Sequence, residues 1–162
     1  MRICCTGSLV RVVLCLLQVI LAQVRQQSVV VCFQRFLTIP ILIVNPKLNS
    51  DDLLASICDE LDISYPEHQL SSKTYLNKLN ERLIQSHAAG RNTILIVDEA
   101  QNLSVDALET IRVLTNLETD EQKLLQIILI GQPELKSRLA APEMEQLNQR
   151  ITARFHLQPL TK

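Results

Sequence analysis

The chain has 162 residues, a formal net charge of −1 and 3% aromatic residues. This length is typical of one domain, and a near-neutral charge with few aromatic side chains argues against a dedicated nucleic-acid-binding module. Cys58 is the one cysteine beyond residue 40, which excludes a disulfide framework in the larger part of the chain.

Residues 1–40 differ in composition from everything that follows them. They contain no Asp, Glu or Lys, whereas all 17 acidic residues lie from Asp51 onward. The stretch Leu9–Ala22 is mostly apolar and could be a signal peptide or a membrane anchor, although Arg11 and Gln18 interrupt it. A second interpretation, translation in a shifted reading frame, depends on the motifs described below.

The next segments predict a strand followed by a helix. Thr38–Val44 is an apolar run, and Asn45-Pro46 would end a strand there. Ser50 could cap a helix with Asp51 and Asp52 in its first turn, where carboxylates interact favourably with the helix dipole. Apolar side chains at helical spacing form one stripe: Leu53, Leu54, Ile57, Cys58 and Leu61.

A second helix is predicted from about Ser72 to Ala89. Gly90 suits the position just after its end, where a left-handed backbone is common. Its apolar positions are Leu76, Leu79, Leu83 and Ile84. Strands that alternate with helices in this way predict an α/β fold with a parallel sheet.

The most informative stretch is Ile94–Asn102, which reads ILIVDEAQN. Four consecutive aliphatic residues are typical of a strand buried on both faces of a parallel sheet. Asp98 and Glu99 then follow at the carboxyl end, where open α/β sheets bind their ligands. In a P-loop NTPase the first acid would hold Mg²⁺ and the second would orient the attacking water. The alternative is a strand end whose two charges simply meet solvent.

A further helix and strand follow the acid pair. Ser104 could cap a helix, and Leu124–Ile130 is a second buried-strand run that ends in Gly131-Gln132-Pro133. AAA+ ATPases have a polar sensor residue at the end of the strand beside the acid-bearing strand, and Gln132 has that position in the sequence. The apolar positions of the predicted helix are Val105, Leu108, Ile111, Leu114 and Leu117.

Two arginines lie just before a short apolar strand that is predicted near the end of the chain. Arg150 and Arg154 occur in the stretch QRITARFHLQPL. AAA+ proteins carry at such a place the arginine that reaches a neighbouring subunit's γ-phosphate. Each arginine alone could equally be a solvated surface charge, but the order of acid pair, sensor and arginine is less easily accidental.

These stretches together resemble the ExeA-like AAA+ ATPases, the family of general secretion pathway protein A and of the MshM ATPases of MSHA pilus biogenesis. The resemblance covers about Thr38 to Lys162. It implies a P-loop NTPase core of three α/β/α layers that stops before the lid domain, and it implies ATP hydrolysis with Mg²⁺. Asp98 would bind Mg²⁺ mostly through water, Glu99 would polarise the attacking water and Gln132 would sense the γ-phosphate.

The same resemblance implies partners and a location. Arg154, or else Arg150, would complete the site of a neighbouring copy in a homo-oligomer. The family builds type II secretion or MSHA-type pilus apparatus at the inner membrane, so a cytoplasmic protein associated with the cytoplasmic face of that membrane is expected.

One required motif is missing from the chain as translated. A P-loop needs G-x-x-x-x-G-K-[ST] to bind phosphates, but the only glycines are Gly7, Gly90 and Gly131. Back-translation of Leu17–Val30, shifted by one base and with permitted third codon bases, gives LTGDIGTGKTTVCR. This contains a complete Walker A loop.

We therefore divide the chain into residues 1–37, an apparently frameshifted Walker A region, and residues 38–162, an AAA+ core fragment. On this hypothesis we expect the chain to lack both its ATP-binding loop and the first strand of its sheet. Two alternatives remain: a DNA-associated helper ATPase of the transposition type, with DNA possible but not indicated, and a non-catalytic scaffold or membrane-attached protein.

Overall fold

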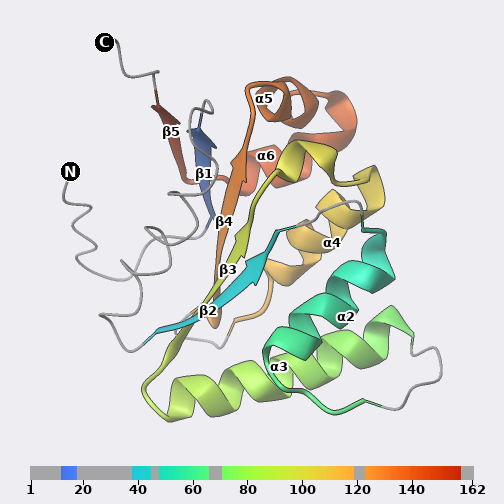
Figure 1. Ribbon diagram of the computed structural model, residues 1–162, viewed down its shortest axis with the longest axis vertical. Helices are drawn as coiled ribbons and strands as arrows, with labels where there is room; N and C mark the ends of the chain where they lie inside the picture. The colour runs from blue at the N-terminus through green and yellow to red at the C-terminus, as the bar shows by residue number, and fades with distance from the viewer. Residues whose placement is uncertain (1–11, 18–37, 45–47, 66–70, 119–122, 158–162) are drawn as a thin grey trace.

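The computed structural model describes residues 12–17, 38–44, 48–65, 71–118 and 123–157 (Figure 1). The strands are β1 (Val12–Leu17), β2 (Thr38–Ile43), β3 (Asn92–Val97), β4 (Leu125–Gly131) and β5 (Ala153–Leu157). The helices are α2 (Ser50–Glu60), α3 (Ser72–Ala88), α4 (Val105–Leu114), α5 (Glu134–Leu139) and α6 (Glu145–Arg150), with 3₁₀ turns η1 (Ala100–Asn102) and η2 (Pro142–Met144).

The five strands form one parallel sheet in the order β2-β3-β4-β1-β5. Because all the strands run the same way, their carboxyl ends meet at one edge of the sheet. β4 has β3 on one side and β1 on the other. The residues that follow these three strands are therefore neighbours in space, although they are far apart in the sequence.

The expectation that the chain lacks its first strand is wrong. Val12–Leu17 forms β1 and pairs in parallel with β4 and β5, for example Leu14 with Leu129 and with Arg154. A strand at a central position needs an unbroken apolar run, and VVLCLL meets that requirement even though it lies within the segment of unusual composition. The membrane-anchor interpretation of Leu9–Ala22 involves residues of which only 12–17 are described, and these are in a strand.

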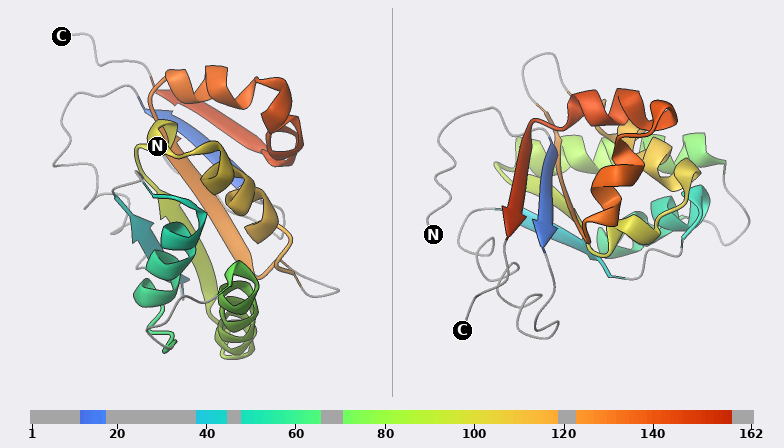
Figure 2. Two further views of the ribbon diagram at one scale, coloured as in Figure 1. Left: turned by 90° about the vertical axis from the view of Figure 1, so that its right-hand side faces the viewer. Right: turned by 90° about the horizontal axis from the view of Figure 1, so that it is seen from above.

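The sheet packs against its helices on one side, as the two views in Figure 2 show. The predicted strands β2, β3 and β4 are confirmed, and β3 is buried on both faces from Thr93 to Val97. β4 alternates, with Leu125, Ile127 and Leu129 buried in the core shared with the helices. Among the described residues the helices form a single layer on the sheet, so the second layer of the predicted α/β/α arrangement is not among them.

The helix ends follow local chemistry, with one correction. α2 is capped by Asn49, whose Oδ1 accepts the N–H of Asp52 at 2.9 Å, and not by Ser50. The Ser50 hydroxyl instead lies 2.6 Å from the Thr110 hydroxyl on α4 and so connects two helices. Ser104 does cap α4 as predicted, since its Oγ accepts the N–H of Ala107 at 3.1 Å.

The ends of α3 and α4 test two further predictions. Gly90 follows α3 with φ +74°, the left-handed conformation that its sequence position predicts. The prediction that Val105 lies on the buried stripe of α4 is wrong: it is the first residue of the helix and is 48% exposed. Among the described helices none is long and apolar enough to cross a membrane.

Candidate functional site

The acid pair lies directly beyond the end of β3. The Asp98 N–H donates to the carbonyl oxygen of Ile43 at 2.9 Å, so β2 fixes the backbone there. Asp98 Oδ1 accepts the N–H of Glu99 at 2.8 Å, which orients that carboxylate relative to its own backbone. Both acids are partly exposed, although the strand that precedes them is buried. The pair is thus rigidly anchored and still accessible to a ligand.

Glu99 has an unusual backbone conformation, with φ 52° and ψ 34°. This left-handed region costs a residue with a Cβ about 1–2 kcal/mol. The turn ends β3 abruptly and starts η1, whose first residue, Ala100, is fully buried. As a result the chain doubles back, and Gln101 comes within hydrogen-bonding distance of the Glu99 carboxylate.

The structure brings Gln132 to Glu99, as the sequence order predicts. Gln132 follows β4, the strand beside β3, and its Nε2 lies 3.5 Å from Glu99 Oε2. This is a long contact for a hydrogen bond, so Gln132 lies at the outer limit of hydrogen-bonding distance. A carboxylate and an amide from neighbouring strand ends therefore face one another across a short gap.

Gln101 is the site residue that the sequence patterns did not single out. Its Nε2 donates to Glu99 Oε2 at 2.6 Å, and its Oε1 accepts the backbone N–H of Gln132 at 3.0 Å. Its own carbonyl oxygen accepts from Arg138 Nη1 on α5. The sequence patterns do not predict this contact, because it depends on the left-handed backbone conformation of Glu99.

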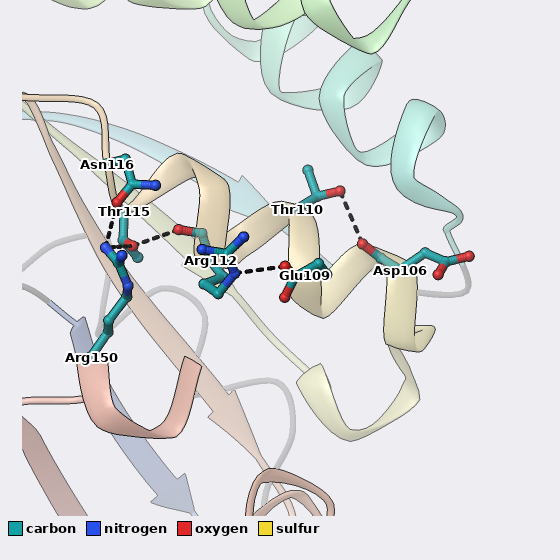
Figure 3. A network of polar contacts seen from close by, with 7 residues as sticks. All are labelled: Asp106, Glu109, Thr110, Arg112, Thr115, Asn116 and Arg150. Atoms are coloured by element: carbon teal, nitrogen blue, oxygen red, sulfur yellow. Dashed lines mark hydrogen bonds and ion pairs between the residues drawn. The ribbon is translucent and has the colours of Figure 1, made fainter. Parts of the chain in front are cut away.

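Arg150 is held within the chain. It is the last residue of α6, and its Nη1 donates to Thr115 Oγ1 at 3.1 Å and also to Asn116 Oδ1 (Figure 3). Both acceptors lie at the end of α4, where a positive charge interacts favourably with the helix dipole. Arg150 is therefore occupied in joining two helices.

Arg154 has a different setting. It lies inside β5, where we expected it to precede the strand, and it is exposed. Its Nη2 donates to the carbonyl oxygen of Asn148 at 3.1 Å and to Asn148 Oδ1 at 2.5 Å. Among the described residues neither arginine hydrogen-bonds to Asp98, Glu99 or Gln132.

The acid pair fits a magnesium ion of the kind that binds together with phosphates. Such Mg²⁺ ions use one or two protein carboxylates and complete their shell with water and phosphate oxygens. Within the described part of the chain no group of three or more His, Cys, Asp or Glu side chains could hold a metal. Asp98 and Glu99 could supply the one or two carboxylates that such an ion uses.

Comparison with known proteins agrees with this geometry. Residues 15–139 match the AAA domain family. The chain is similar to general secretion pathway protein A of Aeromonas hydrophila, with 50% identity over 119 residues that make up 74% of this chain. Those residues span 22% of the relative, so most of that protein has no counterpart here.

Solved structures with the same fold have low sequence identity. The Cdc6p structure from Pyrobaculum aerophilum superposes with a TM-score of 0.62 at 18% identity, covering 89% of this chain and 38% of that one. The ORC2 structure from Aeropyrum pernix gives 0.62 at 14% identity, covering 91% and 41%. These likenesses show the α/β P-loop NTPase core.

Proposed function

Because this chain belongs to the AAA domain family, and is an ExeA-like AAA+ ATPase fragment, we propose that it comes from an ATPase that builds a secretion or pilus apparatus. The apparatus would be of the type II secretion or MSHA pilus kind, given the likeness to general secretion pathway protein A. The intact protein would bind ATP and Mg²⁺ in the cytoplasm, at the cytoplasmic face of the inner membrane.

One observation carries this proposal: the ends of β3 and β4 bring Asp98, Glu99 and Gln132 to one place at the carboxyl edge of the sheet. Asp98 would hold Mg²⁺ mostly through water, and Mg²⁺ supplies charge neutralisation at the phosphates when it is bound. Glu99 would accept a hydrogen bond from the attacking water. Gln132 would donate its amide N–H to the γ-phosphate.

The missing phosphate loop belongs just beyond β1. β1 ends at Leu17, beside β4 and therefore beside Gln132. With permitted third codon bases, a shifted reading frame could encode a Walker A loop from the codons of Leu17–Val30, which begin where the strand ends. We infer that residues 1–37 are a frameshifted version of this region. The coincidence of position supports that inference, because a P-loop always follows a strand and opens a helix.

Arg154 is the better of the two candidate trans arginines. Arg150 donates to residues at the end of α4, so releasing it would remove contacts between two helices. Arg154 is exposed, and among the described residues its Nη2 donates hydrogen bonds only to Asn148, which lies on the adjoining α6. In an oligomer Arg154 would stabilise charge on a neighbouring copy's nucleotide.

The first test is the nucleotide sequence of codons 1 to 41 from fresh template. The neighbouring frame should encode GDIGTGKT, and a different sequence there would show the N-terminal segment to be genuine. The chain as translated should show no measurable ATP binding, because its backbone cradle and lysine are missing. ATP-dependent stabilisation in a thermal melt would contradict that expectation.

The second test uses the full chain with its frame restored. Glu99→Gln should bind ATP but lose about 100-fold or more in hydrolysis rate, because the water loses its basic partner. Glu143→Gln, which changes an exposed acid on η2, is the matched control and should hydrolyse ATP normally. Normal turnover by Glu99→Gln would overturn the assignment of this site.

A further inference from the structure

We propose that Gln101 is a positioning residue that holds the Glu99 carboxylate and the end of β4 in one fixed arrangement. The proposal rests on the proposed ATPase function and adds a residue to it. Gln101 joins two strand ends through a single side-chain amide: Nε2 donates to Glu99 Oε2 at 2.6 Å and Oε1 accepts from the Gln132 backbone at 3.0 Å.

The chemistry of this bridge requires an amide. The group must offer a donor to a carboxylate and an acceptor to a backbone N–H at once, and glutamine has both. A glutamate at this position would keep the acceptor but would set a second carboxylate against Glu99. A methionine side chain has a similar length, but it cannot donate a hydrogen bond and accepts one only weakly.

The two amides near Glu99 leave one of its oxygens available. Gln101 and Gln132 both donate to Oε2. Among the described residues no hydrogen bond goes to Oε1. The arrangement therefore fixes the orientation of the carboxylate while Oε1 remains able to accept a proton-bearing water, which is the role proposed for Glu99.

The surroundings of Gln101 are fitted to this position. A Cβ on residue 131 would lie 2.8 Å from Gln101 Oε1 and 2.9 Å from Leu135 Cδ2, so Gly131 leaves room for both the amide and α5 at the end of β4. Arg138 on α5 donates to the Gln101 carbonyl oxygen and fixes the backbone of the same residue. Two elements, β4 and α5, therefore hold one glutamine.

The first experiment uses the chain as it exists, labelled with ¹³C and ¹⁵N. Gln101→Met should shift the backbone amide resonance of Gln132 and the carboxyl carbon resonance of Glu99 together. Gln85→Met, which changes an exposed glutamine on α3, is the matched control and should shift neither. Unmoved Gln132 and Glu99 resonances in Gln101→Met would overturn the proposal.

The second experiment uses the frame-restored full chain. Gln101→Met should lower kcat roughly 10- to 100-fold, the usual cost of a misplaced catalytic group, with ATP affinity unchanged and Tm lowered only by a few degrees for the lost hydrogen bonds. Gly131→Ala should lower kcat in the same way, and the double variant should lose less than the product of the two effects. Normal kcat in Gln101→Met, or a fall that only follows Tm, overturns the proposal.

The two experiments separate failure of this inference from failure of the proposed function. If the restored chain hydrolyses no ATP while the Gln132 and Glu99 resonances still move together, the ATPase proposal fails and the positioning of Glu99 by Gln101 stands. If the restored chain hydrolyses ATP and Gln101→Met matches it, the function stands and this inference fails.

Discussion

Glu99 combines a charged side chain with a backbone conformation that few residues adopt. Its φ of 52° places it in the left-handed region, where the Cβ crowds the following carbonyl oxygen. Strain of this kind persists where the surrounding structure determines it, and it gathers at functional sites. The hydrogen bonds from Gln101 and to Asp98 Oδ1 provide that surrounding structure here.

This strain can be measured by comparing two variants that remove the same carboxylate. Glu99→Ala and Glu99→Gly lose the same hydrogen bonds, but glycine has no Cβ to crowd the backbone. We expect Glu99→Gly to be more stable than Glu99→Ala by about 1 kcal/mol in urea unfolding.

Glu81 provides the control for this comparison. It is exposed in the middle of α3, where the backbone is helical. There Glu81→Gly should be less stable than Glu81→Ala by about 1 kcal/mol, the opposite sign. If Glu99→Gly were less stable than Glu99→Ala by as much as at Glu81, the left-handed turn would store no strain.

Cys58 predicts a pH dependence at alkaline values. Burial raises the pKa of this thiol from 9.0 to about 11, with the charge of Asp59 as a smaller cause. The folded state therefore favours the protonated thiol, so this contribution is complete below pH 9 and is lost as the pH rises towards 11. Stability should fall over that window, by at most about 1.4 kcal/mol per pH unit from this group.

The test compares urea unfolding at pH 8 and pH 10.5 in the natural chain and in Cys58→Ala. The alanine variant should start less stable, because Cys58 is fully buried. It should then lose less stability between the two pH values, since the titrating thiol is gone. Equal losses in both proteins would mean that the thiol does not contribute to the pH dependence.

The helices differ in whether a side chain accepts a hydrogen bond from the free backbone N–H groups of the first turn. Ser104 caps α4 through its side chain, whereas Ser71, in the same position before α3, makes no side-chain hydrogen bond to the backbone of that helix. Ser104→Ala should therefore cost about 1 kcal/mol in unfolding free energy, the usual value of a lost cap. Ser71→Ala, measured in the same way, should cost less than half as much, and a larger loss at Ser71 would contradict this account.

Long periodic elements could be predicted from the sequence, and contacts that depend on tertiary structure could not. The strands β2, β3 and β4 and the helices α2, α3 and α4 follow apolar runs or helical spacing. The cap of α2 was misassigned by one residue because Asn49 and Ser50 are both good caps. The short α5 and α6 have too few residues to show a period.

The candidate site divides in the same way. The position of Asp98, Glu99 and Gln132 at one edge of the sheet could be predicted because they follow buried strands in the sequence. The contacts of Gln101 could not be predicted, because they depend on a left-handed backbone conformation at Glu99 that residue propensity does not predict. The different settings of Arg150 and Arg154 likewise depend on contacts with Asn116 and Asn148.

A shifted reading frame would remove the phosphate-binding loop but not the first strand of the sheet, because the two have different sequence requirements. A buried strand needs only a run of apolar residues, and Val12–Leu17 provides one in the chain as translated, VVLCLL. A phosphate-binding loop needs glycines and a lysine at fixed spacing, which the translated frame does not provide. β1 therefore forms, although the chain as translated contains no glycine-rich phosphate-binding motif.

β1 also determines how the carboxyl-terminal strand is attached. In the order β2-β3-β4-β1-β5, β5 pairs only with β1 among the described strands and lies at the edge of the sheet that they form. Arg154 belongs to β5, and so its position relative to the acid pair depends on β1. Damage to β1 should consequently release β5 while β2, β3 and β4 remain paired.

Leu14→Pro tests this dependence, because proline in a central strand removes a ladder hydrogen bond. Leu14 pairs with both Leu129 and Arg154. We expect hydrogen exchange, read by mass spectrometry, to lose protection at residues 153–157 while residues 92–97 stay protected. Thr38→Pro, at the first residue of the edge strand β2, should leave protection at 153–157 unchanged. Retained protection of 153–157 in Leu14→Pro would mean that β5 is held by contacts other than β1.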